Sequence, residues 1–584
     1  MRGAAIGWCL AVLCVRLGAA DAVPRLEPGF HTGTITSVAM DSAERFLVTA
    51  AEDQTVRVWD MASVRGEQLR QLVVLRLPAG GAAEGRMYCA AIAPDGSIIA
   101  AAGAHSRSIY LFNRESGKLL RRIAVPDVAL HLEYSPDGRY LAAALNESAG
   151  VRLYRTADWA GAGEDASNQG ATYWAAFSPQ FARDDLLATA AEDGYVRLYA
   201  VRGGRLQLLR RAKAESKDPP VSVVFSPDGR KLAVSLSYPN GYPMVEVWNP
   251  STLARLYRAV PLNAMGGTAE SLAWSGDGKY LYLAGDLAAG SPNSLIVRVG
   301  RGGQDEDFQS VRALGDDGQC YITGLAPLRD GRLVFISADR GGIGLLNAEW
   351  KLERFHAAPL PVYIGLEDYG RFLVSQDGTA VRFAYAQDGA EPAWLSVPKR
   401  SIVPDAPAAG FAGSPPDDQS IDLRGLGTDQ VLLKGKPLDV DGETALRVAV
   451  VKGSGWFLIG TQWGLCLFNG EGKRQWKIEL EASPEALNVS ADGRFAVAAL
   501  SDGTLRWFRM TEGVERLAWF PHPDGKRWVA WTPEGYYDCS AGGEELLGFL
   551  TDRGESQPPD FQPAASLRSK YYRPEAVERA LAAQ

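Results

Sequence analysis

The stretch "LEYSPDGRYLAAAL" (132–145) carries the pattern that decides the fold of this chain. An apolar run stands on each side of a Ser-Pro-Asp-Gly turn. Glycine tolerates the positive φ of such a turn and aspartate bonds its own backbone, so the stretch predicts a β-hairpin. Related segments begin at residues 90, 223, 272 and 487: "AAIAPDGSIIAAAG", "VVFSPDGRKLAVSL", "LAWSGDGKYLYLAG" and "LNVSADGRFAVAAL".

A second type of turn follows about ten residues later in the repeat, and it predicts a third strand. It occurs in "AEDQTVRVWD" (51–60), "AEDGYVRLYA" (191–200), "SQDGTAVRFAY" (375–385) and "SDGTLRWFRM" (501–510). With a variable outer strand, each unit predicts a four-stranded propeller blade. Units begin near residues 31, 88, 127, 172, 219, 269, 321, 362, 445, 485 and 516, and the segment 385–445 has room for one more. About twelve blades exceed one ring and predict two tandem propellers, divided near residue 350 or near residue 300.

The first unit resembles the WD-repeat family most closely, through His31, Thr49, Asp53 and Trp59 in "HTGTITSVAM…FLVTAAEDQTVRVWD". The resemblance implies that these four side chains form a hydrogen-bonded network inside one blade. Such a network satisfies buried polar groups and locks strands together. We therefore expect a structural role for these residues and no catalytic one.

The N-terminus has the order of features of a secretory signal peptide: an early arginine, about a dozen apolar residues, then small residues ending at Ala22. We expect residues 1–22 to be removed and the protein to be exported, with periplasm and external medium both open. No later apolar run reaches about 20 residues, so the sequence predicts no membrane span. The expected division is a first WD-repeat propeller at 23–350, a more degenerate second one at 351–515, and an aromatic-rich closing segment with a short helix at 516–584.

Composition argues against nucleic-acid binding and catalysis. The formal net charge is −8, which disfavours phosphate binding. The five histidines and the cysteines that follow the signal peptide show no metal-ligand spacing, and no nucleophile elbow or phosphate-binding loop occurs. Cys539 lies near Asp538 and Glu544, which raise the pKa of a thiol, so we expect packing and not nucleophilic attack. "PLDVDGE" (437–443) lacks the further ligands of a calcium loop and is interpreted as a turn. No cofactor, no metal and no enzyme activity are predicted.

The C-terminal part, from about residue 417, resembles bacterial proteins in which WD-repeat propellers are linked to a caspase-like peptidase domain. The resemblance is carried by "LKGKPLDVDGETALRVAV" (433–450), "WTPEGYYDCSAGG" (531–543) and "YYRPEAVERAL" (571–581). No caspase-type Gln-Ala-Cys-x-Gly signature occurs in the 584 residues. The resemblance therefore implies the sensing or docking half of such a system without the half that cuts.

The aromatic tail allows two interpretations. Trp528 and Trp531 are three residues apart, so on a strand they face opposite sides, which favours packing. The alternative is a partner-docking face, because tyrosine and tryptophan are enriched in binding hot spots. That alternative assigns docking to Trp531, Tyr536, Tyr537, Tyr571 and Tyr572. The last residues predict a short helix from Pro574, with Val577, Ala580 and Leu581 on its packed side.

The sequence thus predicts a non-catalytic, exported WD-repeat scaffold for protein–protein interaction. A separately encoded caspase-like peptidase is one candidate partner. The first alternative is a ligand- or glycan-binding propeller of the cell envelope, and the second is a propeller enzyme with a site in the central channel. Loops near 157–170, 237–243 and 287–293 are the expected contact surfaces.

Overall fold

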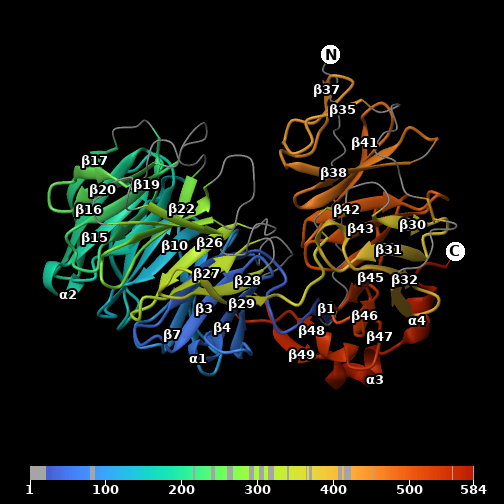
Figure 1. The fold of residues 1–584 in the computed structure, drawn as a ribbon, viewed down its shortest axis with the longest axis horizontal. Helices are drawn as coiled ribbons and strands as arrows, with labels where there is room; N and C mark the ends of the chain where they lie inside the picture. The colour runs from blue at the N-terminus through green and yellow to red at the C-terminus, as the bar shows by residue number, and fades with distance from the viewer. Residues whose placement is uncertain are drawn as a thin grey trace, which may run out of the picture.

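The computed structural model is built from β-strands with a few short helices (Figure 1). It describes residues 22–78, 86–214, 218–237, 244–259, 268–287, 295–300, 308–312, 321–338, 341–363, 365–366, 371–404, 411–412, 422–451, 453–554 and 557–582. Within these residues the strands form twelve antiparallel sheets. The all-β class is confirmed, and so is the expected number of about twelve units. One of the twelve sheets joins the two ends of the chain and is not a repeat.

Seven consecutive four-stranded sheets, which we number blades 1 to 7, form the first ring. In blades 1 to 4 the strands are β2 (Ile35–Met40), β3 (Phe46–Ala51), β4 (Thr55–Asp60), β5 (Gln71–Arg76); β6 (Met87–Ile92), β7 (Ile98–Gly103), β8 (Ser108–Asn113), β9 (Leu119–Ala124); β10 (Ala129–Tyr134), β11 (Tyr140–Leu145), β12 (Val151–Arg155), β13 (Gly161–Asp165); β14 (Thr172–Phe177), β15 (Leu186–Ala191), β16 (Tyr195–Arg202), β17 (Arg205–Lys213).

Blades 5 to 7 continue the same order, from the innermost strand to the outermost. Their strands are β18 (Pro220–Phe225), β19 (Leu232–Leu236), β20 (Met244–Asn249), β21 (Ala254–Arg258); β22 (Thr268–Trp274), β23 (Leu281–Asp286), β24 (Leu295–Val299), β25 (Phe308–Arg312); β26 (Ile322–Pro327), β27 (Leu333–Ser337), β28 (Gly342–Leu346), β29 (Leu352–Ala357). Two single-turn helices, α1 (Met61–Val64) and α2 (Phe181–Asp184), and the 3-10 turn η1 (Glu147–Ala149) lie in this ring.

The Asp-Gly turns form as their pattern predicts. In the quoted segment Gly138 has φ of 72°. The Ser135 hydroxyl donates to Asp137 at 2.7 Å and accepts from the Tyr140 backbone N–H at 2.9 Å. The following strand, β11, is buried along its whole length, because neighbouring blades pack on both of its faces. Its small alanines fit between the two sheets.

The ring closes by packing between blade 7 and blade 1. Each innermost strand contacts the next innermost strand, and β26 contacts β2. Side chains on these strands bond to the free backbone edge of the neighbour: the Cys89 thiol to Ala129 O at 3.4 Å, and the Thr323 hydroxyl to Ile35 O at 2.7 Å. No strand is shared between blades 1 and 7, since each blade is built from its own four consecutive strands.

The second half, which we call the C-terminal module, contains residues 361–582 of the described chain. Its strands are β30 (Leu373–Ser375), β31 (Ala380–Ala384), β32 (Pro392–Ser396), β33 (Ser401–Pro404), β34 (Phe411–Ala412), β35 (Leu423–Arg424), β36 (Leu432–Leu433), β37 (Lys436–Pro437), β38 (Ala445–Val450), β39 (Phe457–Thr461), β40 (Gly464–Phe468), β41 (Arg474–Glu479), β42 (Pro484–Val489), β43 (Phe495–Leu500), β44 (Leu505–Arg509), β45 (Glu515–Pro521), β46 (Trp528–Trp531), β47 (Tyr537–Cys539), β48 (Leu547–Thr551) and β49 (Asp560–Pro563).

Short helices end the C-terminal module: η3 (Gln387–Gly389), η4 (Gly543–Leu546), η5 (Ala564–Leu567), α3 (Arg568–Tyr571) and α4 (Pro574–Arg579). The expected C-terminal helix is confirmed as α4. Val577, Ala580 and Leu581 are buried on one side, in a core shared with β43, β44 and β46. In the described part of the chain, no helix has the length and apolarity needed to cross a membrane.

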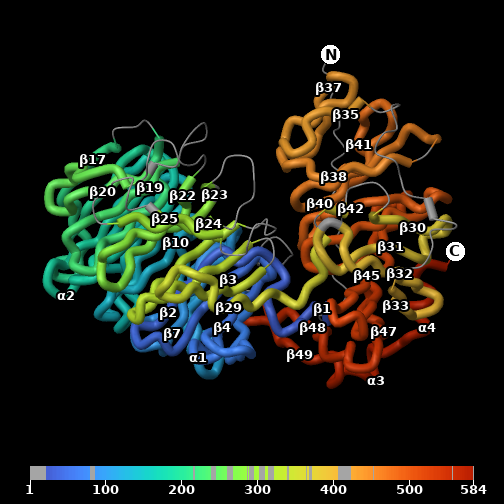
Figure 2. Tube along the Cα trace, viewed as in Figure 1, coloured from blue at the N-terminus to red at the C-terminus, as the bar shows by residue number. Residues whose placement is uncertain are grey.

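The N-terminal strand β1 (Val23–Leu26) lies in the C-terminal module and not in the first ring (Figure 2). It pairs antiparallel with β48, and β49 completes that sheet. An ion pair of 2.7 Å between Arg25 and Glu481 strengthens the attachment. The chain then enters blade 1, so β1 ties the ring to the module. The predicted signal peptide lies outside the described residues except for Ala22.

Candidate interaction site

The four side chains of the WD-repeat pattern meet in blade 1. The Trp59 indole N–H donates to Thr49 Oγ1 at 2.8 Å, and Thr49 Oγ1 lies 2.7 Å from His31 Nε2. On the other side of the imidazole, His31 Nδ1 lies 3.0 Å from Asp53 Oδ2. His31 and Thr49 are fully buried. The chain of contacts joins strands β3 and β4 to the segment before β2.

The donors fix the protonation of this network. An indole N–H only donates, so the Thr49 oxygen accepts from Trp59 and its proton goes to His31 Nε2. The imidazole therefore carries its proton on Nδ1 and donates to Asp53. Burial lowers the pKa of His31, which agrees with a neutral ring. Burial alone would raise the pKa of Asp53, but the His31 N–H and the Thr55 donors hold it below its ordinary value. A neutral histidine bonded through both ring nitrogens agrees with the structural role expected of it.

Blade 4 keeps the frame of this network without the histidine. Thr189 occupies the place of Thr49 and is hydrogen-bonded to Tyr199, which replaces the tryptophan. Tyr199 donates to Asp165 at 2.9 Å. Asn168 stands where blade 1 has His31, and its amide nitrogen bonds to Gly170 and Thr172 instead.

The aromatic tail packs, as the opposite orientation of its two tryptophans predicts. Trp528 stacks on Trp519 with ring centroids 4.3 Å apart, in the core shared with α4. Trp531 belongs to a different core, together with Tyr537 and Phe549. The strand β46 that carries both tryptophans covers the outer edge of β45.

The docking interpretation of this tail is wrong for three of its five residues. Trp531, Tyr537 and Tyr571 are buried, and a partner cannot reach them. The physical reason is the sheet formed by β1 and β48, which covers them: Tyr571 stacks on Phe549 of β48 at 4.5 Å. Tyr572 is partly buried beside Tyr537, and Tyr536 remains exposed.

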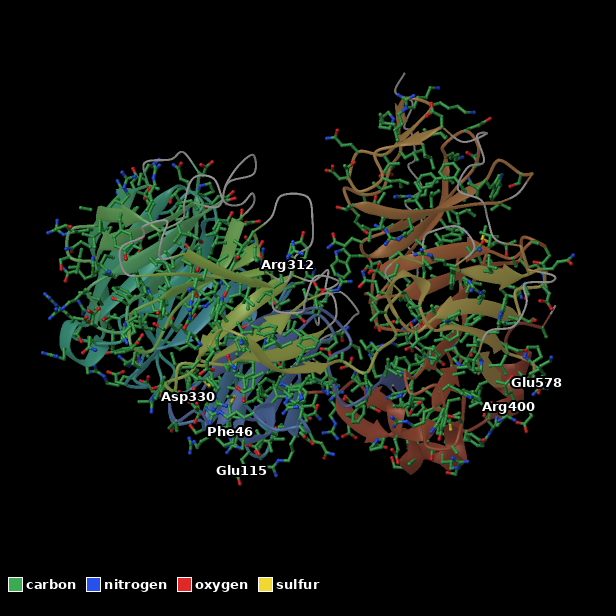
Figure 3. All side chains as sticks on the ribbon, in the orientation of Figure 1. Phe46, Glu115, Arg312, Asp330, Arg400 and Glu578 are labelled. Carbon is green, nitrogen blue, oxygen red and sulfur yellow. The ribbon has the colours of Figure 1, made fainter. Side chains whose placement is uncertain are left out.

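Cys539 is half-buried and its thiol is not activated. Burial, Glu544 and Asp538 raise its pKa to about 11, as the neighbouring carboxylates predict. Asp538 is itself fully buried and accepts from Arg400 at 2.5 and 2.6 Å. Figure 3 labels Arg400 on the C-terminal module. Cys89 and Cys466 are buried free thiols, and Cys320 lies outside the described residues.

The acidic turn at 437–443 is occupied by cations of the protein itself. Asp441 lies 3.0 Å from Arg474 and 2.8 Å from Lys477, and Glu443 lies 2.5 Å from Lys477. These ion pairs lower the carboxyl pKa values against the opposing effect of burial on Glu443. Across the described ranges, no group of three His, Cys, Asp or Glu side chains is placed to hold a metal ion.

A channel of about 1070 Å³ runs through the first ring, lined by innermost strands. Apolar side chains such as Phe177, Phe225 and Leu272 line much of it. Two titratable groups on β10 also line it. Burial raises the pKa of Glu133 to about 8 and lowers the pKa of His131 to about 3. His131 stacks on Trp174 at 3.9 Å, so its ring is held in place.

The C-terminal module reaches the mouth of this channel. Trp463 lines the channel, and the guanidinium of Arg86 lies 3.5 Å above its ring. Arg86 also donates to Leu480 O at 3.0 Å. A cation over an indole face is a favourable contact, and it is stronger when it is shielded from water. Arg86 thus joins blade 2 to the module at the channel mouth.

A cleft of about 480 Å³ separates the first ring from the C-terminal module and adjoins the channel. Thr34, Glu52 and Trp463 line both spaces. Burial raises the pKa of Glu52. Tyr321, which also lines the cleft, is 37% exposed. This is a concave surface on which the two halves of the molecule meet, and sequence patterns gave no sign of it because its residues come from distant units.

One of the three expected contact loops is not a loop, and the other two lie almost entirely outside the described residues. The segment 157–170 contains strand β13, the outer strand of blade 3, and is therefore not a long loop. That expectation is wrong because Gly161 and Gly163 pair with β12 across a bulge. Apart from residues 237 and 287, the segments 237–243 and 287–293 lie outside the described residues.

Comparison with known protein families matches residues 27–60 to the family model "WD domain, G-beta repeat". This is the unit that holds the His31 network. The chain carries a WD repeat. Together with the repeated antiparallel sheets, this match supports a WD-repeat β-propeller-like architecture. Comparison with curated proteins finds no match. WD repeats are typical of protein-interaction scaffolds, and this class of function is the one the repeat supports.

Proposed function

We propose that this protein is a non-catalytic interaction scaffold and that its partner binds in the cleft between the first ring and the C-terminal module. The observation that carries the proposal is the continuity of that cleft with the channel mouth, where Glu52 and Trp463 line both spaces. Rigid propellers present recognition surfaces at such concave junctions.

The chemistry of the cleft favours a protein partner. Tyr321 and Trp463 supply two aromatic anchors, the residue types that dominate binding hot spots. Charged groups of the cleft are paired: Arg447 with Glu485 at 3.2 Å inside the cleft, and Glu481 with Arg25 of β1. A paired polar rim around aromatic anchors is the usual anatomy of a protein interface.

Site-specific photo-crosslinking tests the proposal. A benzoylphenylalanine at position 321 places the probe in the cleft, and the same group at position 536 is the matched control on the similarly exposed tail tyrosine. In cells of the source organism, a stoichiometric protein captured from position 321 but not from 536 supports the cleft. Capture from 536 alone would assign docking to the tail and refute the cleft.

The finer parts of the proposal are export and a caspase-like partner. The signal-like N-terminus supports export, and the resemblance of the C-terminal part supports a peptidase partner that is encoded separately. A covalent cysteine-peptidase probe added to the crosslinked sample tests the partner: a labelled companion supports it, and an unlabelled stoichiometric companion refutes it. N-terminal sequencing of the mature protein from envelope and medium tests cleavage after Ala22.

Ligand binding in the channel is a second candidate function, favoured by one observation. The channel is largely apolar and contains Glu133, whose raised pKa keeps a carboxyl group able to donate a hydrogen bond at neutral pH. A thermal-shift screen of sugars and apolar small molecules tests it. A rise in melting temperature that Glu133→Gln abolishes supports this candidate, and no rise with any compound counts against it.

A further inference from the structure

The outer strands of several blades share a bulge that carries a leucine. The pairing of β8 with β9 shifts register between Leu111 and Phe112 of β8, which leaves Leu120 of β9 opposite no residue. The same shift in β17 leaves Leu209 unpaired, and in β21 it leaves Leu256 unpaired. These three leucines are 50%, 39% and 49% exposed. A bulged residue points away from the ladder, so each leucine protrudes from the rim of the ring.

Cations flank these leucines on blades 4 and 5. Strand β17 reads "RLQLLRRAK" and β21 reads "ARLYR", which together give six Arg or Lys residues and no carboxylate. Every cation on β17 is exposed. Arg211 and Lys213 lie over the Tyr195 ring at 4.8 and 4.7 Å, which keeps their charges on the outer surface. In β21, Arg255 is partly neutralised by Glu246 at 3.2 Å.

The exposed leucines on these outer strands are not explained by protection of the sheet edge against pairing with other chains. Charges on an outer strand prevent pairing with other chains, but exposed leucines do not serve that purpose. The bulge at Leu209 also interrupts the row of backbone donors and acceptors, so an added strand cannot pair along the whole of β17. What remains is a surface that offers protruding apolar side chains among cations.

We propose that the outer edges of blades 4 and 5 bind an anionic lipid surface. The leucines at 208, 209 and 256 enter the boundary between headgroups and acyl chains, and the surrounding cations contact the lipid phosphates. Two neighbouring outer edges lie on one side of a ring, so a flat surface can rest on both. The charge of this face is opposite to the formal net charge of the chain, −8.

The placement of these edges agrees with such a role. Strand β17 lies at the end of the first ring far from the C-terminal module, which leaves it uncovered (Figure 1). Blade 3, on the other side of blade 4, has the acidic outer strand "GAGED", which limits the basic face to blades 4 and 5. Blade 2 has the same Leu-Leu-Arg-Arg sequence in β9 as in β17. Because blade 3 separates it from blade 4, β9 is a matched control within the same protein.

Vesicle cosedimentation tests the proposal. The full chain is mixed at low salt with vesicles of phosphatidylcholine containing 30% phosphatidylglycerol, or of phosphatidylcholine alone, a composition chosen at roughly the charge density of anionic membranes. We expect binding to the anionic vesicles only, weakened by salt. Leu209→Ser lowers the partition coefficient about tenfold. Arg210→Ser with Arg211→Ser lowers it about 25-fold, at about fivefold per cation.

The control variants are Leu120→Ser, and Arg121→Ser with Arg122→Ser, on blade 2. We expect both to bind like the parent protein, with circular dichroism confirming that all variants fold. Equal losses from the blade 2 variants would overturn the assignment to blades 4 and 5. Absence of binding to the anionic vesicles would overturn the lipid proposal outright. Binding to polyglutamate but not to vesicles would overturn it as well, and would assign the face to an acidic protein segment.

Discussion

Replacing Thr49 with valine removes one hydroxyl group from the centre of blade 1 and keeps the shape of the side chain. In the native protein that hydroxyl accepts from the Trp59 N–H and donates to His31 Nε2. Valine can do neither. The change therefore leaves two polar groups buried without partners, in a site that water cannot reach because His31 and Thr49 are fully buried.

The expected loss in the free energy of unfolding depends on how many buried polar groups are left without a partner. Each buried donor or acceptor that loses its partner costs about 1–3 kcal/mol. Two such groups predict a loss of about 2–6 kcal/mol in the free energy of unfolding of the first ring. Thr189→Val in blade 4 is the matched control, because Thr189 lies in the same place and is hydrogen-bonded to Tyr199 without a histidine. It leaves no group without a partner, because Tyr199 still donates to Asp165, so a loss below about 1 kcal/mol is expected.

Urea unfolding followed by tryptophan fluorescence measures both variants, with the slope against urea checked for constancy. The comparison is sound because both sites belong to the same ring. We expect the loss for Thr49→Val to exceed that for Thr189→Val by at least about 1 kcal/mol. Equal losses, or a loss below about 1 kcal/mol for Thr49→Val, would refute the view that Thr49 holds the network together.

Four further predictions follow from the same structure. In the native protein, burial lowers the folded-state pKa of His131 to about 3, so the unfolded state binds more protons below pH 6.5 and the free energy of unfolding falls by about 1.4 kcal/mol per pH unit. His131→Gln removes this pH dependence, which urea midpoints between pH 6.5 and 4.5 measure. Glu133→Gln removes a pH dependence of the opposite sign. The folded-state pKa of Glu133 is raised to about 8 from 4.5, so the native protein loses stability as pH rises through this interval. The variant lacks this loss, so its stability relative to the native protein is greater at pH 8 than at pH 5, as urea midpoints at the two pH values measure. Arg400→Ala leaves the buried Asp538 carboxylate without its cation and destabilises the C-terminal module by about 3 kcal/mol. Arg400→Lys keeps a positive charge and loses only part of this stability, as denaturant unfolding of the three proteins will show. Deleting residues 23–26 exposes the edge of β48, so hydrogen exchange at 547–551 accelerates while exchange in blades 3 to 5 stays unchanged; equal exchange at 547–551 contradicts the pairing.

The repeats and their strands could be predicted from the sequence because their causes are local. The Ser-Pro-Asp-Gly turn bonds within five residues, as Ser135 does to Asp137 and Tyr140. The alternation of apolar residues around it then sets which face each side chain takes. The opposite sides of Trp528 and Trp531 and the packed side of α4 follow from the same periodicities.

The docking residues and the contact surfaces could not be predicted in this way. Tyr537 and Tyr571 have the composition of a hot spot, but whether they are exposed depends on what covers them. The cover is the sheet in which β48 supplies Phe549 and pairs with β1, a strand more than 500 residues earlier in the chain. No local pattern records a partner at that distance, since a short strand such as "VPRL" has many possible neighbours.

The sequence by itself determined the all-β repeat architecture, the WD-type network of blade 1 and the acidic surroundings that, together with burial, raise the pKa of the Cys539 thiol. Each of these depends on residues close together in the chain or on the charge of immediate neighbours. Only the tertiary structure decided how the ring closes without a shared strand, which aromatic residues are buried, and where the cleft and the basic rim lie. These depend on contacts between blades, and such contacts are set by the packing of whole sheets and not by the order of residues within any one of them.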